Sequence, residues 1–390
     1  MQRATKPDEA VYLDHAATTP LAPEVRAAMA PWMESEHGNP SSRHAAGQRA
    51  ASALEDAREQ VAGAVGAAPE SVVFVSGGTE ANNLALFGLA RARAAHGKHV
   101  LVGAAEHSSV RAPAQALREE GFEVEELALD AGGRLDLAAA RGQLRADTVL
   151  VSHMLANNEL GSVHPIAELA RAARANSPHA WVHVDAVQAF GKCDVRLVGL
   201  GAHALSLSAH KVHGPKGVGA LVLERGVRPK PLFYGGGQED GLRSGTEAVA
   251  SCVGFGRAAE LAVRERRTFL ERAQQQRERL LQAALAIGAR PALEEGGERI
   301  PNVLGVIVPG PPGEVWLHHL AEQGVYVGTG SACQSRRGTL SPALLAHGLG
   351  EEEARHLLRL STARTTTDAE IERACAALES VAEALEGVRG

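Results

Sequence analysis

A chain of 390 residues is long enough for about two or three domains, and its 45% hydrophobic and 22% charged content is typical of a globular protein. A net charge of −6 without a basic run argues against a nucleic-acid-binding surface. The sequence contains no stretch of about 18 uncharged apolar residues that could span a membrane, and its first residues lack the apolar segment of a signal peptide. The widely spaced cysteines form no CxxC pair, so we expect a cytoplasmic protein without disulfides or a metal site.

The N-terminal part predicts a short strand followed by two helices. Val11-Tyr-Leu13 is an apolar run that leads into a polar turn. Pro23 suits the first turn of a helix over 23–34. The Gly, Pro and Asn residues of 36–42 predict a loop, and the Ala-rich segment 43–66 predicts a second helix.

From about residue 70 to 255, short apolar runs alternate with helical patterns. This alternation predicts an α/β fold with a mostly parallel sheet, covered by helices on both faces. The runs are continuously apolar, as expected for strands that are buried on both sides. They are 71–75, 99–102, 123–127, 148–153, 181–184, 204–208 and 219–223.

The character changes near residue 257. A long charged helix is predicted over 257–287, and shorter strands and helices follow up to a final helix from about residue 368. We therefore predict a large domain over 15–256. A smaller α+β domain would combine residues 1–14 with residues 257–390.

A glycine-rich turn, Ser76-Gly-Gly-Thr-Glu80, follows the first of these buried strands and opens a helix. Such a turn presents free N–H groups and the positive end of the helix dipole, which suits a phosphate group. Gly78 and Thr79 are the candidate ligands. The alternative is an ordinary helix cap made by Thr79, without a ligand.

Polar residues follow several other strands. His107 could stack on a flat ring or move protons, or it could be an ordinary loop histidine. Asn158 could donate to a ligand hydroxyl. Asp185 stands at the carboxyl end of a predicted parallel strand, where it could keep a pyridine nitrogen protonated or simply cap the next turn.

Lys211 lies where the strand 204–208 becomes a loop, next to His210. Burial would lower the pKa of this lysine, and a neutral amine can condense with an aldehyde; otherwise it is an exposed loop lysine. Taken with the phosphate turn, the histidine and the aspartate, this lysine predicts a site for pyridoxal 5′-phosphate along one edge of the sheet.

Two further features concern the substrate. Cys333 lies in the glycine-rich segment 328–338 beside Arg336 and Arg337, whose charges would favour its thiolate. An incidental surface thiol is the alternative. Arg359 and Arg364 flank a short strand, and either could bind a substrate carboxylate or form an ordinary salt bridge.

Ten motifs together resemble those of the cysteine desulfurases, which are pyridoxal-phosphate enzymes of fold type I in the class V aminotransferase group. They occur in the family's order over nearly the whole chain. With an intact GSAC motif and 25 residues between Cys333 and Arg359, the chain is similar to the long-loop subgroup. The motifs are YLDHAATTP, GNPSSRH, SGGTEANNLA, EHSSV, NNELG, HVDAVQ, SAHKVHGPKG, GGGQEDGLRSGTE, GSACQS and RLSTAR.

The resemblance implies a role for each matched residue. Lys211 would form the Schiff base with the cofactor, His107 would stack on its ring and act in catalysis, and Cys333 would be the nucleophile. Arg359, with Arg364 as second choice, would bind the cysteine carboxylate, and Asn39 would also contact the substrate. The remaining cofactor contacts would come from Gly78, Thr79, Asn158, Asp185, Gln188, Ser208 and His210, and from Thr246, which would reach the phosphate of the partner subunit.

The implied reaction converts L-cysteine to L-alanine in a homodimer, leaves the sulfur as a persulfide on Cys333 and passes it to an acceptor protein. That acceptor would serve iron–sulfur cluster assembly or another sulfuration pathway, and Cys333 could share an iron–sulfur cluster with a scaffold. The basic segment QSRRGT departs from the family's small residues and leaves the acceptor open. A selenocysteine lyase and a catalytically silent sulfur-transfer partner are the alternatives.

Overall fold

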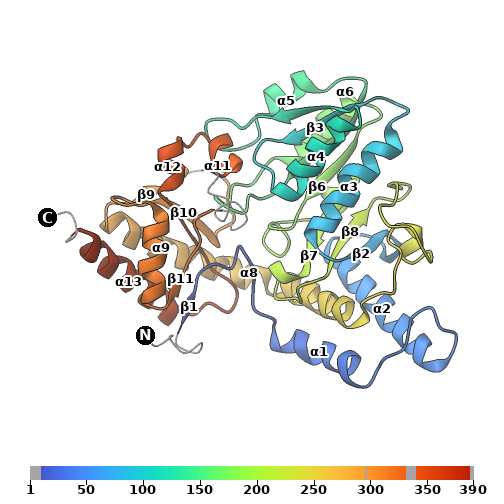
Figure 1. The fold of residues 1–390 in the computed structure, drawn as a ribbon, viewed down its shortest axis with the longest axis horizontal. Helices are drawn as coiled ribbons and strands as arrows, with labels where there is room; N and C mark the ends of the chain where they lie inside the picture. The colour runs from blue at the N-terminus through green and yellow to red at the C-terminus, as the bar shows by residue number, and fades with distance from the viewer. Residues whose placement is uncertain (1–9, 295–296, 331–339, 387–390) are drawn as a thin grey trace.

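The computed structural model describes residues 10–294, 297–330 and 340–386. Its central element is a seven-stranded sheet with the strand order β2-β8-β7-β6-β5-β3-β4 (Figure 1). The strands are β2 (Val72–Val75), β3 (His99–Gly103), β4 (Glu123–Leu127), β5 (Thr148–Met154), β6 (Trp181–Asp185), β7 (Ala204–Ser208) and β8 (Gly219–Leu223).

The sheet is mostly parallel, which confirms the predicted fold class. Strands β4, β3, β5, β6 and β7 pair in parallel, whereas β8 runs antiparallel to both β7 and β2. Strands such as β2 and β8 are continuously apolar because both faces of the sheet are buried, whereas the edge strand β4, Glu123-Val-Glu-Glu-Leu127, has exposed positions and departs from the predicted continuous run. In β2, for example, Val72 and Phe74 enter the core on one face, and Val73 and Val75 enter the core on the other.

Helices supply the second half of each core. On one face lie α3 (Gly78–Arg93) and α4 (Ser108–Glu119). The other face packs against helices that precede the sheet in the chain, lie between its strands or follow it. These are α1 (Pro23–Glu34), α2 (Ala45–Ala64), α5 (Leu137–Gln143), α6 (Ile166–Asn176), α7 (Leu197–Leu200) and the first half of α8 (Val249–Ala286).

A smaller group of elements forms a second lobe, at the left of Figure 1. Its antiparallel sheet has the order β12-β10-β9, and β1 pairs in parallel with β11, so the N-terminal segment packs on the C-terminal part. The elements are β1 (Val11–Tyr12), β9 (Arg290–Pro291), β10 (Val303–Ile307), α9 (Gly313–Glu322), β11 (Val325–Tyr326), α11 (Pro342–Ala346), α12 (Glu351–Arg355), β12 (Leu357–Ser361) and α13 (Asp368–Glu386).

Helix α8 joins the two lobes and starts earlier than the charge pattern predicts. It begins at Val249, whereas the sequence analysis placed its start near residue 257. The earlier turns were missed because they are apolar and largely buried and lack the charged, periodic pattern. Cys252 and Phe255 belong to the core of the large sheet, whereas Leu280 and Ala284 belong to the core of the small lobe. The helix therefore crosses the predicted domain boundary at residue 256, and that division stays a prediction.

None of the helices within the described ranges is long and apolar enough to cross a membrane. The same part of the chain contains no group of three or more His, Cys, Asp or Glu side chains that could hold a metal ion.

Candidate active site

A cavity of about 260 Å³ lies at the carboxyl edge of the parallel strands. The last residues of β5, β6 and β7, which are Met154, Asp185 and Ser208, all line it. Ligand sites of open α/β sheets form at this edge. The cavity gathers ten of the residues predicted from the sequence: Gly78, Thr79, His107, Asn158, Asp185, Gln188, Ser208, His210, Lys211 and Arg359.

Lys211 ends the short 3₁₀ helix η3 (Ala209–Lys211), which directly follows β7. Its Nζ donates to the carbonyl oxygens of Ala16 at 2.7 Å and Ala17 at 2.8 Å, so the N-terminal segment holds the amine in place. Burial lowers the pKa of Lys211 to about 7, and the positive charges of Arg359 and Lys192 add to this effect. A large fraction of this amine is therefore neutral, and nucleophilic, near neutral pH.

Asp185 is 6% exposed, and neighbouring groups fix both oxygens of its carboxylate. Oδ1 accepts from the backbone N–H of Val187 at 2.9 Å, and Oδ2 accepts from Nδ2 of Asn82 at 2.7 Å. The Val187 contact is the capping bond that the sequence suggested as an alternative. The carboxylate makes this bond and also lines the cavity, so the two interpretations are compatible.

His107 is the N-cap residue of α4 and lines the same cavity. Its Nδ1 accepts from the backbone N–H of Ser109 at 3.1 Å and lies 2.8 Å from the Ser109 Oγ. Burial lowers the pKa of the ring, although the Asp185 carboxylate opposes this. The ring is thus neutral and held by its Nδ1 edge, which suits a ring that stacks on a flat ligand.

Ser109 and Asn82 connect His107 to Asp185. Asn82 donates from Nδ2 both to Ser109 Oγ at 2.8 Å and to Asp185 Oδ2 at 2.7 Å. The sequence analysis assigned neither residue a role, although both lie inside quoted motifs, EANN and EHSSV. Asn82 is on the second turn of α3, where only the fold shows that it faces a strand end about 100 residues later.

The start of α3 leaves free donors and open space at the cavity. Its N-cap residue, Gly77, has φ 153°, a backbone conformation that favours glycine, and no side chain caps the helix. A Cβ at Gly78 would lie 2.8 Å from Cγ2 of Val187 and 3.5 Å from Cβ of Ser208, so glycine keeps this space open. The buried Ser208 Oγ has no hydrogen-bond partner among the described residues. These unused donors fit a phosphate group.

The geometry also separates the two candidate arginines. Arg359 lines the cavity; its Nη1 donates to the Asn158 carbonyl oxygen at 2.9 Å, and its Nη2 lies 2.6 Å from Asp14 Oδ1. Arg364 lines a neighbouring pocket instead, and its Nη1 pairs with Glu265 Oε2 at 2.7 Å. Of the two arginines, Arg359 lines the 260 Å³ cavity together with Lys211, and Arg364 does not.

Comparison with known proteins agrees with this architecture. The profile of the aminotransferase class-V family matches residues 11–374. The chain belongs to this family. The cysteine desulfurase IscS 1 of Archaeoglobus fulgidus is 40% identical over 374 residues, which are 96% of this chain and 97% of the relative.

Solved structures also overlay nearly the whole chain. A NifS-like protein has a TM-score of 0.91 and 33% identity, covering 96% of this chain and 99% of its own. The structure described as SspA in complex with cysteine has a TM-score of 0.79 and 34% identity, covering 90% and 98% of the two chains. Both likenesses support a fold type I architecture.

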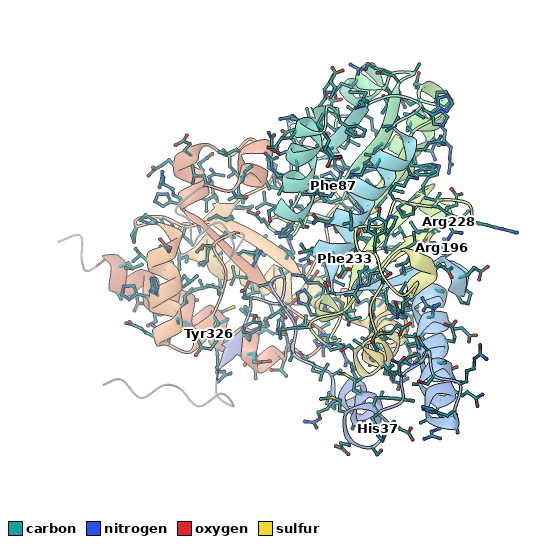
Figure 2. The ribbon with its side chains drawn as sticks, turned by 45° about the vertical axis from the view of Figure 1, so that its right-hand side comes forward. His37, Phe87, Arg196, Arg228, Phe233 and Tyr326 are labelled. Carbon is teal, nitrogen blue, oxygen red and sulfur yellow. The ribbon has the colours of Figure 1, made fainter. Side chains whose placement is uncertain are left out.

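Two described residues with predicted roles, Asn39 and Thr246, do not line the cavity of this class-V protein. A third, Cys333, lies outside the described residues. Asn39 is exposed in the loop after α1, and its Oδ1 accepts from the backbone N–H of Ser41 at 2.9 Å. Thr246 is exposed as well. His37, close to Asn39 in the same loop, lies at the edge of the molecule in Figure 2, and Phe233, in the loop that leads to Thr246, is exposed as well.

Proposed function

We propose that this protein is a cysteine desulfurase that uses pyridoxal 5′-phosphate to convert L-cysteine to L-alanine and holds the released sulfur as a persulfide on Cys333. The single observation that carries the proposal is one cavity lined by a lysine with lowered pKa, a fixed aspartate and a buried arginine: Lys211, Asp185 and Arg359.

The cavity fits the cofactor at both of its ends. The open N-terminus of α3, with Gly78, Thr79, Ser208 and His210, would hold the phosphate, and Asp185 would hold the ring nitrogen. Gln188 would reach the ring hydroxyl, because its Nε2 already donates to Ala16 while its buried Oε1 has no partner in the described ranges. When bound, the cofactor supplies an aldehyde and a ring that withdraws electrons from the substrate.

Arg359 and Lys211 would act on the substrate. The guanidinium of Arg359 would bind the cysteine carboxylate, and its buried Nε still lacks a partner among the described residues. The relative described as being in complex with cysteine makes this amino acid the natural candidate. The neutral amine of Lys211 would take the proton from the substrate Cα and return a proton during product formation.

The nucleophile must be a thiolate, and three of the four cysteines are poorly suited to that role. Burial raises the pKa of Cys193 to about 11, that of Cys252 to about 12, and also that of Cys375. Cys333 is the remaining cysteine. Its thiolate would attack the substrate sulfur: an S–S bond forms, the Cβ–S bond breaks, and the electron pair stays with the substrate carbon.

The two ends of segment 331–339 support this assignment. Before the segment, Gly328 exchanges backbone hydrogen bonds with Arg359, the proposed carboxylate ligand. After it, the Ser341 hydroxyl donates to Oε1 of the buried Glu159 at 2.8 Å. Glu159 directly follows Asn158, which lines the cavity. Both ends of the segment that carries Cys333 are thus fixed close to the site.

We further propose a homodimer that passes sulfur from Cys333 to a thiol of an acceptor protein. The exposed segment around Thr246 would reach the cofactor phosphate of the partner subunit, and the exposed loop with Asn39 would contact substrate from the same interface. Exposure of both segments in the single chain supports this arrangement.

The products of the reaction test this proposal directly. The purified protein, supplied with pyridoxal 5′-phosphate, L-cysteine and a thiol reductant, should release L-alanine and sulfide in equal amounts, measured by chromatography and a colorimetric sulfide assay. No added keto acid should be needed. Absence of alanine would contradict a desulfurase. Alanine formation only with a keto acid acceptor would also contradict it and would indicate a transaminase.

A further inference from the structure

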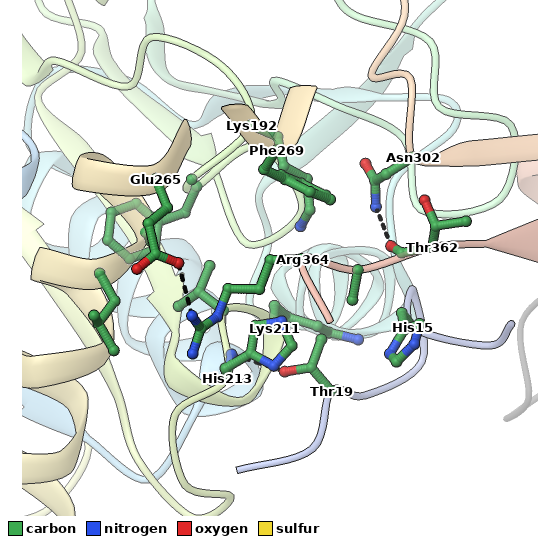
Figure 3. Close-up of a pocket in the computed structure, with 16 residues that line it drawn as sticks. His15, Thr19, Lys192, Lys211, His213, Glu265, Phe269, Asn302, Thr362 and Arg364 are labelled. Atoms are coloured by element: carbon green, nitrogen blue, oxygen red, sulfur yellow. Dashed lines mark hydrogen bonds and ion pairs between the residues drawn. The ribbon is translucent and has the colours of Figure 1, made fainter. Parts of the chain in front are cut away.

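A second, smaller cavity of about 40 Å³ lies next to Lys211, and Asp185 does not line it (Figure 3). Lys211 lines both cavities. The second cavity also contains Lys192, a lysine for which neither the sequence analysis nor the proposed chemistry has a use. Phe190, Leu261 and Phe269 supply part of its wall, so apolar as well as polar groups line the space.

Several polar side chains around this cavity have atoms without a hydrogen-bond partner in the described part of the chain. Four buried side-chain atoms that belong to its lining residues have no partner in the described part of the chain. Buried polar groups are almost always paired with protein or with ordered water. A polar cavity of this volume holds about two or three water molecules. The four atoms are His15 Nδ1, Asn302 Oδ1, Thr362 Oγ1 and Arg364 Nε.

Lys192 brings an uncompensated positive charge to this space. Its Nζ donates to the Gln188 carbonyl oxygen at 3.0 Å, and no carboxylate in the described ranges forms an ion pair with it. Glu265, the acidic residue of the cavity wall, is already paired with Arg364 and Arg264. Burial lowers the pKa of Lys192 to about 8 and that of Lys211 to about 7, and the positive charge of Lys192 is among the causes that lower the pKa of Lys211.

We propose that the cavity holds ordered water and that Lys192 is a positioning residue, whose charge acts across it to keep the Lys211 amine neutral and reactive. The inference rests on the proposed role of Lys211. Two ammonium groups that face one small cavity repel each other, and the low polarity of the interior strengthens this repulsion. The water molecules would complete the hydrogen bonds of Lys192 and give Lys211 a route for proton exchange.

Other charged and titratable groups around Lys211 set the background for this effect. On the cofactor side, Arg359 opposes protonation of Lys211, whereas Asp14 and Asp185 favour it. Four histidines lie on the surrounding elements, and burial lowers the pKa of each, so they are neutral near pH 7: His15, His107, His210 and His213. Two further cations line the second cavity with Lys211: Arg364, which is paired with Glu265, and Lys192, which has no carboxylate partner in the described ranges and does not itself line the cofactor cavity.

The test is a pH titration of Lys211 in the full-length protein freed of cofactor, which does not depend on desulfurase activity. Brief labelling with a small anhydride at a series of pH values, followed by mass spectrometry of the Lys211 peptide, reports the neutral amine fraction. In the unsubstituted protein the midpoint should lie near pH 7. Lys192→Met should move it upward by about half a unit or more, because a like charge is lost.

Lys192→Arg keeps the charge and should keep the Lys211 midpoint at its original value. If Lys192 only supported the fold, the Lys211 midpoint would not depend on whether residue 192 is charged, as in Lys192→Arg, or neutral, as in Lys192→Met. Lys230→Met removes an exposed lysine elsewhere and is the matched control. If Lys192→Met does not fold, Lys192→Gln serves instead. A Lys211 midpoint that is the same with and without the Lys192 charge overturns the proposal. A high-resolution crystal structure with a dry cavity overturns its water site.

Discussion

Lys211→Ala should lower alanine formation from L-cysteine by roughly a thousandfold or more, because the variant loses both the nucleophile for the cofactor aldehyde and the base for the substrate proton. The amine is fixed by the carbonyl oxygens of Ala16 and Ala17 and opens on the cofactor cavity, which no other lysine of the described residues lines. Steady-state alanine release, measured with saturating cofactor, checks this expectation.

Lys216→Ala is the matched control for this prediction. Lys216 lies five residues further along the chain and is exposed, so its loss should leave the rate within about twofold of the original. Far-UV circular dichroism of the Lys211 variant should match the original protein, since one alanine at the end of a 3₁₀ turn creates no large core cavity. A Lys211→Ala protein with undiminished turnover would refute the assignment of this site.

Asp185→Asn should reduce turnover by about a hundredfold or more, because the negative charge that pairs with the protonated ring nitrogen is removed. The substitution preserves shape, and an amide oxygen can still accept from the Val187 N–H, so the capping bond survives. The contact to Asn82 would then place two amide groups together, which reorients the new side chain rather than unfolding β6. The measurement is alanine release at saturating cofactor, with cofactor affinity determined separately by titration.

Asp136→Asn provides a matched control for Asp185→Asn. Asp136 caps α5 through Oδ1, which accepts from the backbone N–H groups of Ala138 and Ala139, and it lies far from the cavity in the fold. Because asparagine caps helices about as well as aspartate, this variant should keep full activity. Equal activity of Asp185→Asn and the original protein would contradict a charged partner for the ring.

Much of the fold follows from the sequence, because buried parallel strands carry a strong signal. The runs at 148–153 and 204–208 lie within β5 and β7, and the residues at their carboxyl ends meet at one cavity as open sheets require. The start of α8 was missed for the opposite reason: its first turns are apolar on several faces and lack the periodicity that identifies an amphipathic helix.

Some residues of the site could also be predicted from the sequence, and others could not. Lys211 and Asp185 were predicted because each stands at a strand end. Asn82 lies within a helix and Lys192 within a turn, where no local pattern shows which group each side chain faces. Arg359 and Arg364 could not be separated by sequence spacing alone. The structure separates them because Arg359 belongs to β12 and lines the cofactor cavity, whereas the chain has left that strand before Arg364.

The central claim is that sulfur moves from L-cysteine to Cys333, and mass spectrometry of that thiol tests it most directly. After one equivalent of L-cysteine is added and free thiols are blocked, the peptide that contains Cys333 should carry one additional sulfur atom, and a similar amount of L-alanine should appear. Cys333→Ala should form no alanine above background while it retains bound cofactor. Undiminished alanine formation by this variant, or the added sulfur on Cys193, Cys252 or Cys375, would contradict the account.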